Sequence, residues 1–254
     1  MLTVRSELMR AFERRSFDQF VDELVERAWS YSPRLCKTLS DEELERAVRQ
    51  TIERAAGHGF VQRGAVRFFL ETSIALGSDF DSDPQYPWAA ETLASDQFWS
   101  PMDKADALHS RVASYVERVQ PSARAALERL HVVATGPRQF EQASLAHDLE
   151  QLLREVHPEK VVALGEDALA RAVAAGLQKA QTLGLEGPRA GFVVVALSFA
   201  FGHAFDRDPF VPWIQRTLQP ASQAERAPAR LAEKLEKRAM IWIEAVLKAS
   251  ERKD

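Results

Sequence analysis

Two short segments of the chain carry aspartates at a spacing that could hold a divalent cation. Each contains an Asp-x-Asp pair, and carboxylate oxygens are the ligands that Mg²⁺ and Ca²⁺ prefer in proteins. Two carboxylates in each segment are few for such a site, and neither segment has the glycine pattern of an EF-hand loop. The pairs are Asp81 with Asp83 in GSDFDSDPQYPW (residues 77–88) and Asp206 with Asp208 in GHAFDRDPFVPW (residues 202–213).

One possible function is therefore a metal-dependent enzyme that uses these four aspartates, with His203 beside them on the same face as Asp206. Such an enzyme would need a deep polar pocket in which several acids converge. The sequence contains no glycine-rich phosphate loop, no nucleophile elbow and no histidine pair at metal-ligand spacing. We therefore expect a protein without catalytic residues, metal or cofactor, and we keep the aspartate site as the alternative.

The interpretation that we favour is structural, because each segment has the composition of a rigid corner between two helices. Asp is a good helix N-cap and proline is favoured directly after it. A glycine retained inside a helical pattern suggests close approach of another backbone, and the tryptophan would plug the turn onto the core. The corner residues are Gly77, Phe80, Asp81, Asp83, Pro84, Pro87 and Trp88, then Gly202, Phe205, Asp206, Asp208, Pro209, Pro212 and Trp213.

Replacing Asp81 by Asn distinguishes the two interpretations. Asn caps a helix as well as Asp does, but it lacks the charge that a hard cation needs. If the corner only caps, thermal unfolding of Asp81→Asn should match that of the parent protein. Loss of a Mg²⁺- or Ca²⁺-dependent stabilisation in the variant would favour the metal site.

The two corners belong to a longer internal repeat. Setting each residue n against residue n+125 aligns residues 39–93 with residues 164–218 without a gap, and 19 of the 55 positions are identical. After the first corner, corresponding residues of the two copies lie 127 positions apart instead of 125. The sequence thus predicts two tandem copies of one unit, residues 1–120 and residues 131–254, with a linker at 121–138 where Gly136 and Pro137 interrupt the helical pattern.

Within each copy the apolar residues follow a helical period, and no alternating segment predicts a strand. Ser40 and Glu43 form a capping box that begins one amphipathic helix. We predict an all-α fold of about five helices per copy, the copies packed together with a pseudo-two-fold relation. Besides a helix after each corner, the predicted helices are 16–30, 40–59, 63–77 and 103–119 in the first copy, and 139–156, 165–184, 188–202 and 229–248 in the second.

The most apolar stretch, residues 191–205, is too short to cross a membrane and has no charge before Gly202. A helix that is apolar all round must be covered on every side. Packing between the two copies is the simplest cover, and a homodimer or a bound partner would also serve. The net charge of −4 argues against nucleic-acid and anionic-membrane partners. With a single cysteine and no signal peptide, the sequence predicts a cytoplasmic protein.

The chain resembles a family of uncharacterised bacterial proteins that combine a Gly-x-Asp-Phe-Asp-x-Asp-Pro-x-x-Pro-Trp turn with an upstream amphipathic helix. The resemblance covers the first copy, through residues 39–59 and 77–88, and the second copy departs from it at His203 and Ala204. Many such proteins are encoded beside spike, adaptor or toxin genes of type VI secretion systems. The resemblance implies an accessory, adaptor or chaperone-like protein that binds a secreted effector or spike component. An immunity protein that masks a toxin is a further alternative.

Overall fold

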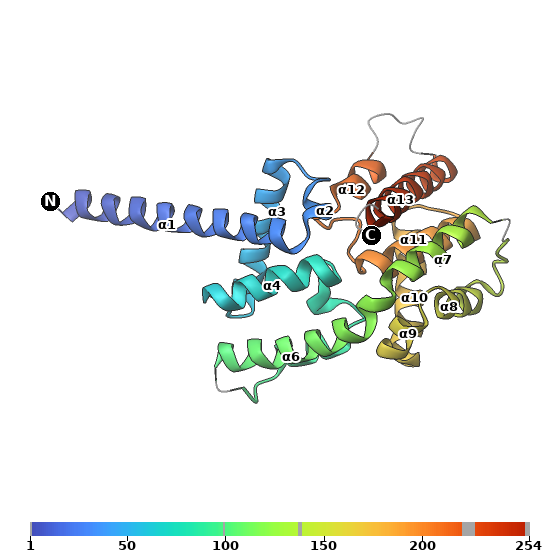
Figure 1. The fold of residues 1–254 in the computed structure, drawn as a ribbon, viewed down its shortest axis with the longest axis horizontal. Helices are drawn as coiled ribbons and strands as arrows, with labels where there is room; N and C mark the ends of the chain where they lie inside the picture. Colours follow the sequence, from blue (N-terminus) through green and yellow to red (C-terminus); the bar gives the residue numbers. More distant parts are fainter. Residues whose placement is uncertain (1, 99, 137–138, 220–226, 252–254) are drawn as a thin grey trace.

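The computed structural model describes residues 2–98, 100–136, 139–219 and 227–251 (Figure 1). These residues form helices joined by turns and contain no strand, which confirms the predicted all-α class. None of the helices in these segments combines the length and the apolarity that a bilayer crossing requires.

The first half of the chain contains the predicted helices and one additional short helix. The capping box is confirmed, since the Ser40 hydroxyl accepts from the Glu43 N–H and the Glu43 carboxylate accepts from the Ser40 N–H. The first helix starts well before residue 16, and its N-terminal part projects from the body of the molecule (Figure 1). The elements are α1 (Leu2–Tyr31), α2 (Pro33–Cys36), α3 (Asp41–Gly57), α4 (Arg63–Leu76), the 3-10 turn η1 (Phe80–Ser82), α5 (Pro87–Ala94) and α6 (Pro101–Val119).

The second half adds a helix where the sequence predicted a linker. Most of residues 121–138 is helical, as α7, which packs against α8 and α13; Pro137 lies outside the described residues. The helix predicted from residue 139 begins only at Leu145. The elements are η2 (Gln120–Ser122), α7 (Ala123–Thr135), α8 (Leu145–Val156), α9 (Pro158–Leu164), α10 (Glu166–Thr182), α11 (Pro188–Phe201), α12 (Pro212–Leu218) and α13 (Pro228–Glu251).

The buried apolar side chains gather in two clusters, one in each half. The first is built from α1, α3, α4 and α6, and the second from α8, α10, α11 and α13. Phe210 is an exception, because it follows the second corner yet packs in the cluster of the first half. The side chain of Phe210 therefore ties the two cores together.

The helices of the two halves keep a common spacing. α10 and α11 begin and end 125 residues after α3 and α4 respectively, and α8 ends 125 residues after α1. Their packing also corresponds. The α1–α3, α1–α4, α3–α4 and α4–α6 contacts of the first half are matched by α8–α10, α8–α11, α10–α11 and α11–α13 contacts in the second.

The apolar helix α11 is covered differently from the expectation. Its side chains are buried along most of its length by α8, α10 and α13, all from its own half. The C-terminal end of α11 meets the first half, where the Gln85 side-chain amide donates to the carbonyl oxygen of Ser198 at 2.9 Å. Packing between the halves is thus a minor part of its cover.

The two corner glycines end α4 and α11 instead of lying inside them. Gly77 and Gly202 adopt φ angles of +102° and +92°, which disfavour any residue with a Cβ. The close backbone approach predicted for them is confirmed. A Cβ on Gly77 would lie 2.4 Å from the carbonyl oxygen of Phe201, and a Cβ on Gly202 would lie 3.0 Å from that of Leu76.

Gly77→Ala should lower the free energy of unfolding by about 3 kcal/mol or more, because the positive φ and the contact with the Phe201 carbonyl each cost roughly 1–3 kcal/mol. Urea unfolding followed by far-UV circular dichroism measures the change. Gly64→Ala is the matched control: Gly64 lies in the first turn of α4 with no atom within 4 Å of an added Cβ. This control should stabilise by up to about 1 kcal/mol. Equal effects of the two substitutions would contradict the close approach.

Candidate functional site

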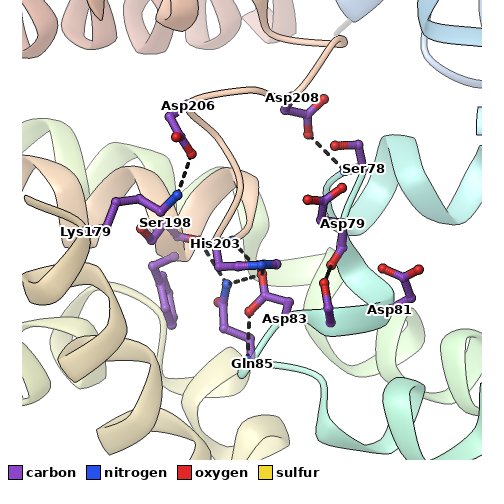
Figure 2. A network of polar contacts seen from close by, with 12 residues as sticks. Ser78, Asp79, Asp81, Asp83, Gln85, Lys179, Ser198, His203, Asp206 and Asp208 are labelled. Atoms are coloured by element: carbon purple, nitrogen blue, oxygen red, sulfur yellow. Dashed lines mark hydrogen bonds and ion pairs between the residues drawn. The ribbon is translucent and has the colours of Figure 1, made fainter. Parts of the chain in front are cut away.

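The two corners, residues 77–88 and 202–213, bond to each other through their inner aspartates. The backbone N–H of Ser78 donates to Asp208 Oδ2 at 2.9 Å, and the backbone N–H of His203 donates to Asp83 Oδ2 at 2.6 Å (Figure 2). Each aspartate thus accepts from the residue that follows the glycine of the other corner. Both side chains are buried, at 2% exposure for Asp83 and 5% for Asp208.

Each inner aspartate also closes its own turn. Asp83 Oδ1 accepts from the Gln85 N–H, and Asp208 Oδ1 accepts from the Phe210 N–H, both at 2.8 Å. These are bonds to the residue two positions on, as in an Asx turn. The predicted N-cap role is therefore wrong: α5 and α12 begin at Pro87 and Pro212, four residues after each aspartate. The placement of these two prolines in a first helical turn is confirmed.

The outer aspartates bind cationic side chains within their own halves. Asp81 accepts from the Arg54 guanidinium and lies 2.6 Å from His58 Nε2, while Asp206 accepts from Lys179 Nζ. Burial raises the pKa of Asp81, but the hydrogen bonds from His58 and Arg54 outweigh it, so that this pKa is lowered. Asp81 is therefore a buried carboxylate held ionised by its partners.

Asp208 shows the opposite shift. Burial raises its pKa to about 6, although the N–H groups of Ser78 and Phe210 act to lower it. A pKa raised in the folded state means that the associated stability is present below the ordinary aspartate pKa of about 4 and is lost as the pH rises through about 6. Above that pH the ionised carboxylate depends on its two N–H donors.

The four aspartates do not converge on a common point (Figure 2). A cavity of about 100 Å³ borders the first corner, and Asp83 is the one aspartate among its lining residues, with Lys179 and His203 nearby. His203 faces Asp83, with Nδ1 3.4 Å from Oδ2, and Asp206, its partner in the metal-enzyme alternative, binds Lys179. Among the described residues, no cluster of three or more His, Cys, Asp or Glu side chains could hold a metal ion.

The aromatic plug of each corner is the phenylalanine instead of the tryptophan. Phe80 and Phe205 are fully buried, whereas Trp88 and Trp213 are half-buried. Trp88 packs against Tyr86 and Tyr115, with ring centroids 5.9 and 6.0 Å away. Truncating either tryptophan should therefore cost less than the loss of a fully buried ring.

Sequence reasoning missed the cations that pair with the outer aspartates. Arg54 and Lys179 each precede their aspartate by 27 residues and occupy corresponding positions in the two halves. The available signal was that both halves keep a basic residue at corresponding positions, 27 residues before the outer aspartate. It also missed Asp79, which binds both Arg54 and Arg207 and so links the halves a second time.

No protein-family model, curated protein or solved structure matches this chain. The site is therefore interpreted from its own geometry.

The structure changes the expected result for Asp81→Asn. Asp81 is a partner of Arg54 and His58 and not a cap, so the neutral side chain should cost roughly 1–3 kcal/mol of unfolding free energy at pH 7. Because the folded-state pKa is lowered, the contribution of Asp81 is present above the ordinary aspartate pKa and is lost as the pH falls below about 4. The two proteins should therefore approach equal stability in acid.

Asp18→Asn is the matched control, because Asp18 forms an exposed pair with Arg49 at 3.0 Å. An exposed pair contributes at most about 1 kcal/mol. Urea titrations from pH 3 to pH 8 measure both variants. An Asp81→Asn protein as stable as its parent at pH 7 would contradict the assigned role.

Proposed function

We propose that this chain is a non-enzymatic protein-interaction module that acts in the cytoplasm and binds an apolar helix of a partner protein. The observation that carries the proposal is an apolar groove between α7, α11 and α13. Glu236 is the one charged residue that lines it within the described part of the chain. The lining residues are Leu127, Leu130, Ala134, Phe192, Val193, Ala196, Leu197, Ala200, Phe201, Glu236, Ala239, Met240, Trp242 and Ile243.

Two aromatic rings and one paired acid are among the residues that line the groove. Phe201 and Trp242 meet edge to face on it, with centroids 4.9 Å apart, and both rings remain partly exposed. Glu236 at the edge is held by Arg189, so its charge is already paired. A groove of this kind suits the apolar face of an amphipathic helix, in which residues about one turn apart serve as anchors.

We also propose that the two halves are copies of one unit related by a pseudo-two-fold axis. The common helix spacing and the matching packing support the duplication. The reciprocal bonds of Asp83 and Asp208, and the mutual approach of Gly77 and Gly202, support the two-fold relation, because each contact has its counterpart in the other direction. On this proposal the corners are scaffolding that sets the angle between the copies.

The resemblance to proteins encoded beside type VI secretion genes supplies the biological context. An accessory or chaperone-like protein that shields an apolar segment of an effector or spike component needs the kind of groove described above. An immunity protein would be expected to present a strongly charged complementary surface, and the groove does not favour that alternative. The pairing of all four corner aspartates likewise favours an adaptor over the metal-dependent enzyme.

The test measures binding to the products of the genes that flank the one encoding this chain. Each product is co-expressed with the tagged chain, and retained pairs are measured by isothermal titration calorimetry. Met240→Glu places a charge in the groove and should weaken binding, so that the dissociation constant rises by at least about tenfold. Lys237→Gln is the control, because it makes the same change in net charge at an exposed position of α13.

Failure of every neighbouring product to bind, or equal binding by Met240→Glu and the parent chain, would overturn the proposal. Sedimentation velocity of the chain alone tests the remaining alternative, which is a homodimer formed through the groove. A homodimer dissociated by Met240→Glu would mean that a second copy, and not another protein, fills the groove.

A further inference from the structure

A second cavity lies beside the groove, at the junction of the two halves. Its volume is about 250 Å³, and its walls come from α4 and α6 of the first half and from α7, α8, α9, α11 and α13 of the second. Leucine, alanine, valine and phenylalanine side chains form most of the lining. The polar groups on it are Tyr86, Tyr115, His157 and Lys160. We call it the Lys160 cavity.

Lys160 is a buried amine with few partners. The residue is 6% exposed, and its Nζ donates to the carbonyl oxygen of Phe199 near the C-terminal end of α11. Nζ also lies 4.3 Å from the centroid of the Phe199 ring. An ammonium group carries three N–H donors, and the Phe199 carbonyl is the one acceptor that the described residues provide. Burial lowers the pKa of Lys160 to about 8, which leaves the amine largely protonated at neutral pH.

A second buried donor lines the same cavity. Tyr115 is 3% exposed; burial raises its pKa, while a hydrogen bond between its hydroxyl and that of Tyr86 acts to lower it. The Tyr86 ring is near both residues, 5.8 Å from Lys160 Nζ and 5.3 Å from the Tyr115 ring. A phenol hydroxyl that shares one hydrogen bond can still bond a ligand, and the buried ammonium has donors that no acceptor uses.

The cavity is large enough for a ligand and can be reached from solvent. An engineered apolar cavity of about 150 Å³ in another protein binds benzene, so a cavity of about 250 Å³ admits a longer molecule. Ala123 and Ala200 on its lining are exposed, so part of the cavity wall reaches the surface of the molecule. Leu127, Leu130 and Ala196 line both the cavity and the groove, so the two share part of their walls.

We propose that the Lys160 cavity binds a small monocarboxylate with an apolar body. The carboxylate accepts hydrogen bonds from Lys160 Nζ and from the Tyr115 hydroxyl, and the apolar body lies against the walls formed by α7 and α11. One ammonium group matches one carboxylate in charge. A phosphate dianion would be desolvated with too few donors among these apolar walls. This inference is independent of the proposed partner binding.

Sodium octanoate and 1-octanol are suitable probes, because they share a chain length and differ in charge. We expect octanoate to bind the full-length chain at pH 7 at least about tenfold more tightly than 1-octanol, as a charge-assisted hydrogen bond supports. Lys160→Met, which keeps an unbranched apolar side chain, should abolish that preference while 1-octanol binding persists. Isothermal titration calorimetry measures each dissociation constant, and circular dichroism verifies the fold.

Two further variants keep the test decisive. Tyr115→Phe removes one hydroxyl and should weaken octanoate binding several-fold without changing 1-octanol binding. Lys37→Met removes an exposed amine outside the cavity and should change neither. Absence of saturable octanoate binding to the parent chain at millimolar concentration would overturn the proposal. So would unchanged octanoate binding by Lys160→Met, or, if that variant does not fold, by Tyr115→Phe.

Discussion

The close approach of two backbones at Gly77 and Gly202 is the constraint on which the arrangement of the two halves depends. At this point the ends of α4 and α11 meet with no side chain between them, because a Cβ on Gly77 would overlap the Phe201 carbonyl oxygen. The backbone N–H groups of Ser78 and His203 lie just beyond the ends of α4 and α11 and need acceptors from elsewhere. The inner aspartates supply the missing acceptors, each from the opposite corner. The close contact of the two glycines and the hydrogen bonds of the inner aspartates therefore depend on one another.

That dependence explains why acids occupy a buried junction. A buried carboxylate is costly unless it is paired or hydrogen-bonded. Asp83 and Asp208 bond to N–H groups, while Asp79 and Asp81 bind arginine, so the acidity of the corners is matched from within the fold. The same junction leaves Lys160 on the second half with fewer bonds than it can form. The corner aspartates are all paired or hydrogen-bonded, whereas Lys160 in the neighbouring cavity keeps unused donors.

Much of the fold was predictable from the sequence because helical periodicity and capping are local signals. The amphipathic pattern and the Ser40 capping box identified α3, and the paired glycines indicated a close backbone contact. The partners of the aspartates were not predictable from local rules. Asp83 satisfies an N–H that lies 120 residues away, and Asp81 binds a guanidinium 27 residues earlier. Only the three-dimensional packing distinguishes such roles from a helix cap.

The extent of α7 and the Lys160 cavity were not predicted, because both depend on packing between segments distant in the sequence. Gly136 and Pro137 indicated a break, but the residues before them have apolar side chains that pack against α8 and α13. Lys160 has no local feature that separates it from a surface lysine. Its burial follows from contacts of α9 with both α6 and α10, which belong to different halves. The sequence therefore does not indicate that Lys160 is buried.

The reciprocal bonds between the corners also bear on how the chain is made. The acceptor for the Ser78 N–H is 130 residues further along the chain. At ribosomal speeds of about 5–20 residues per second, that acceptor is synthesised on the order of ten seconds later. During this interval the first half can assemble its own core, but the end of α4 stays open to water. Completion of the junction is therefore a late event in the synthesis of the chain.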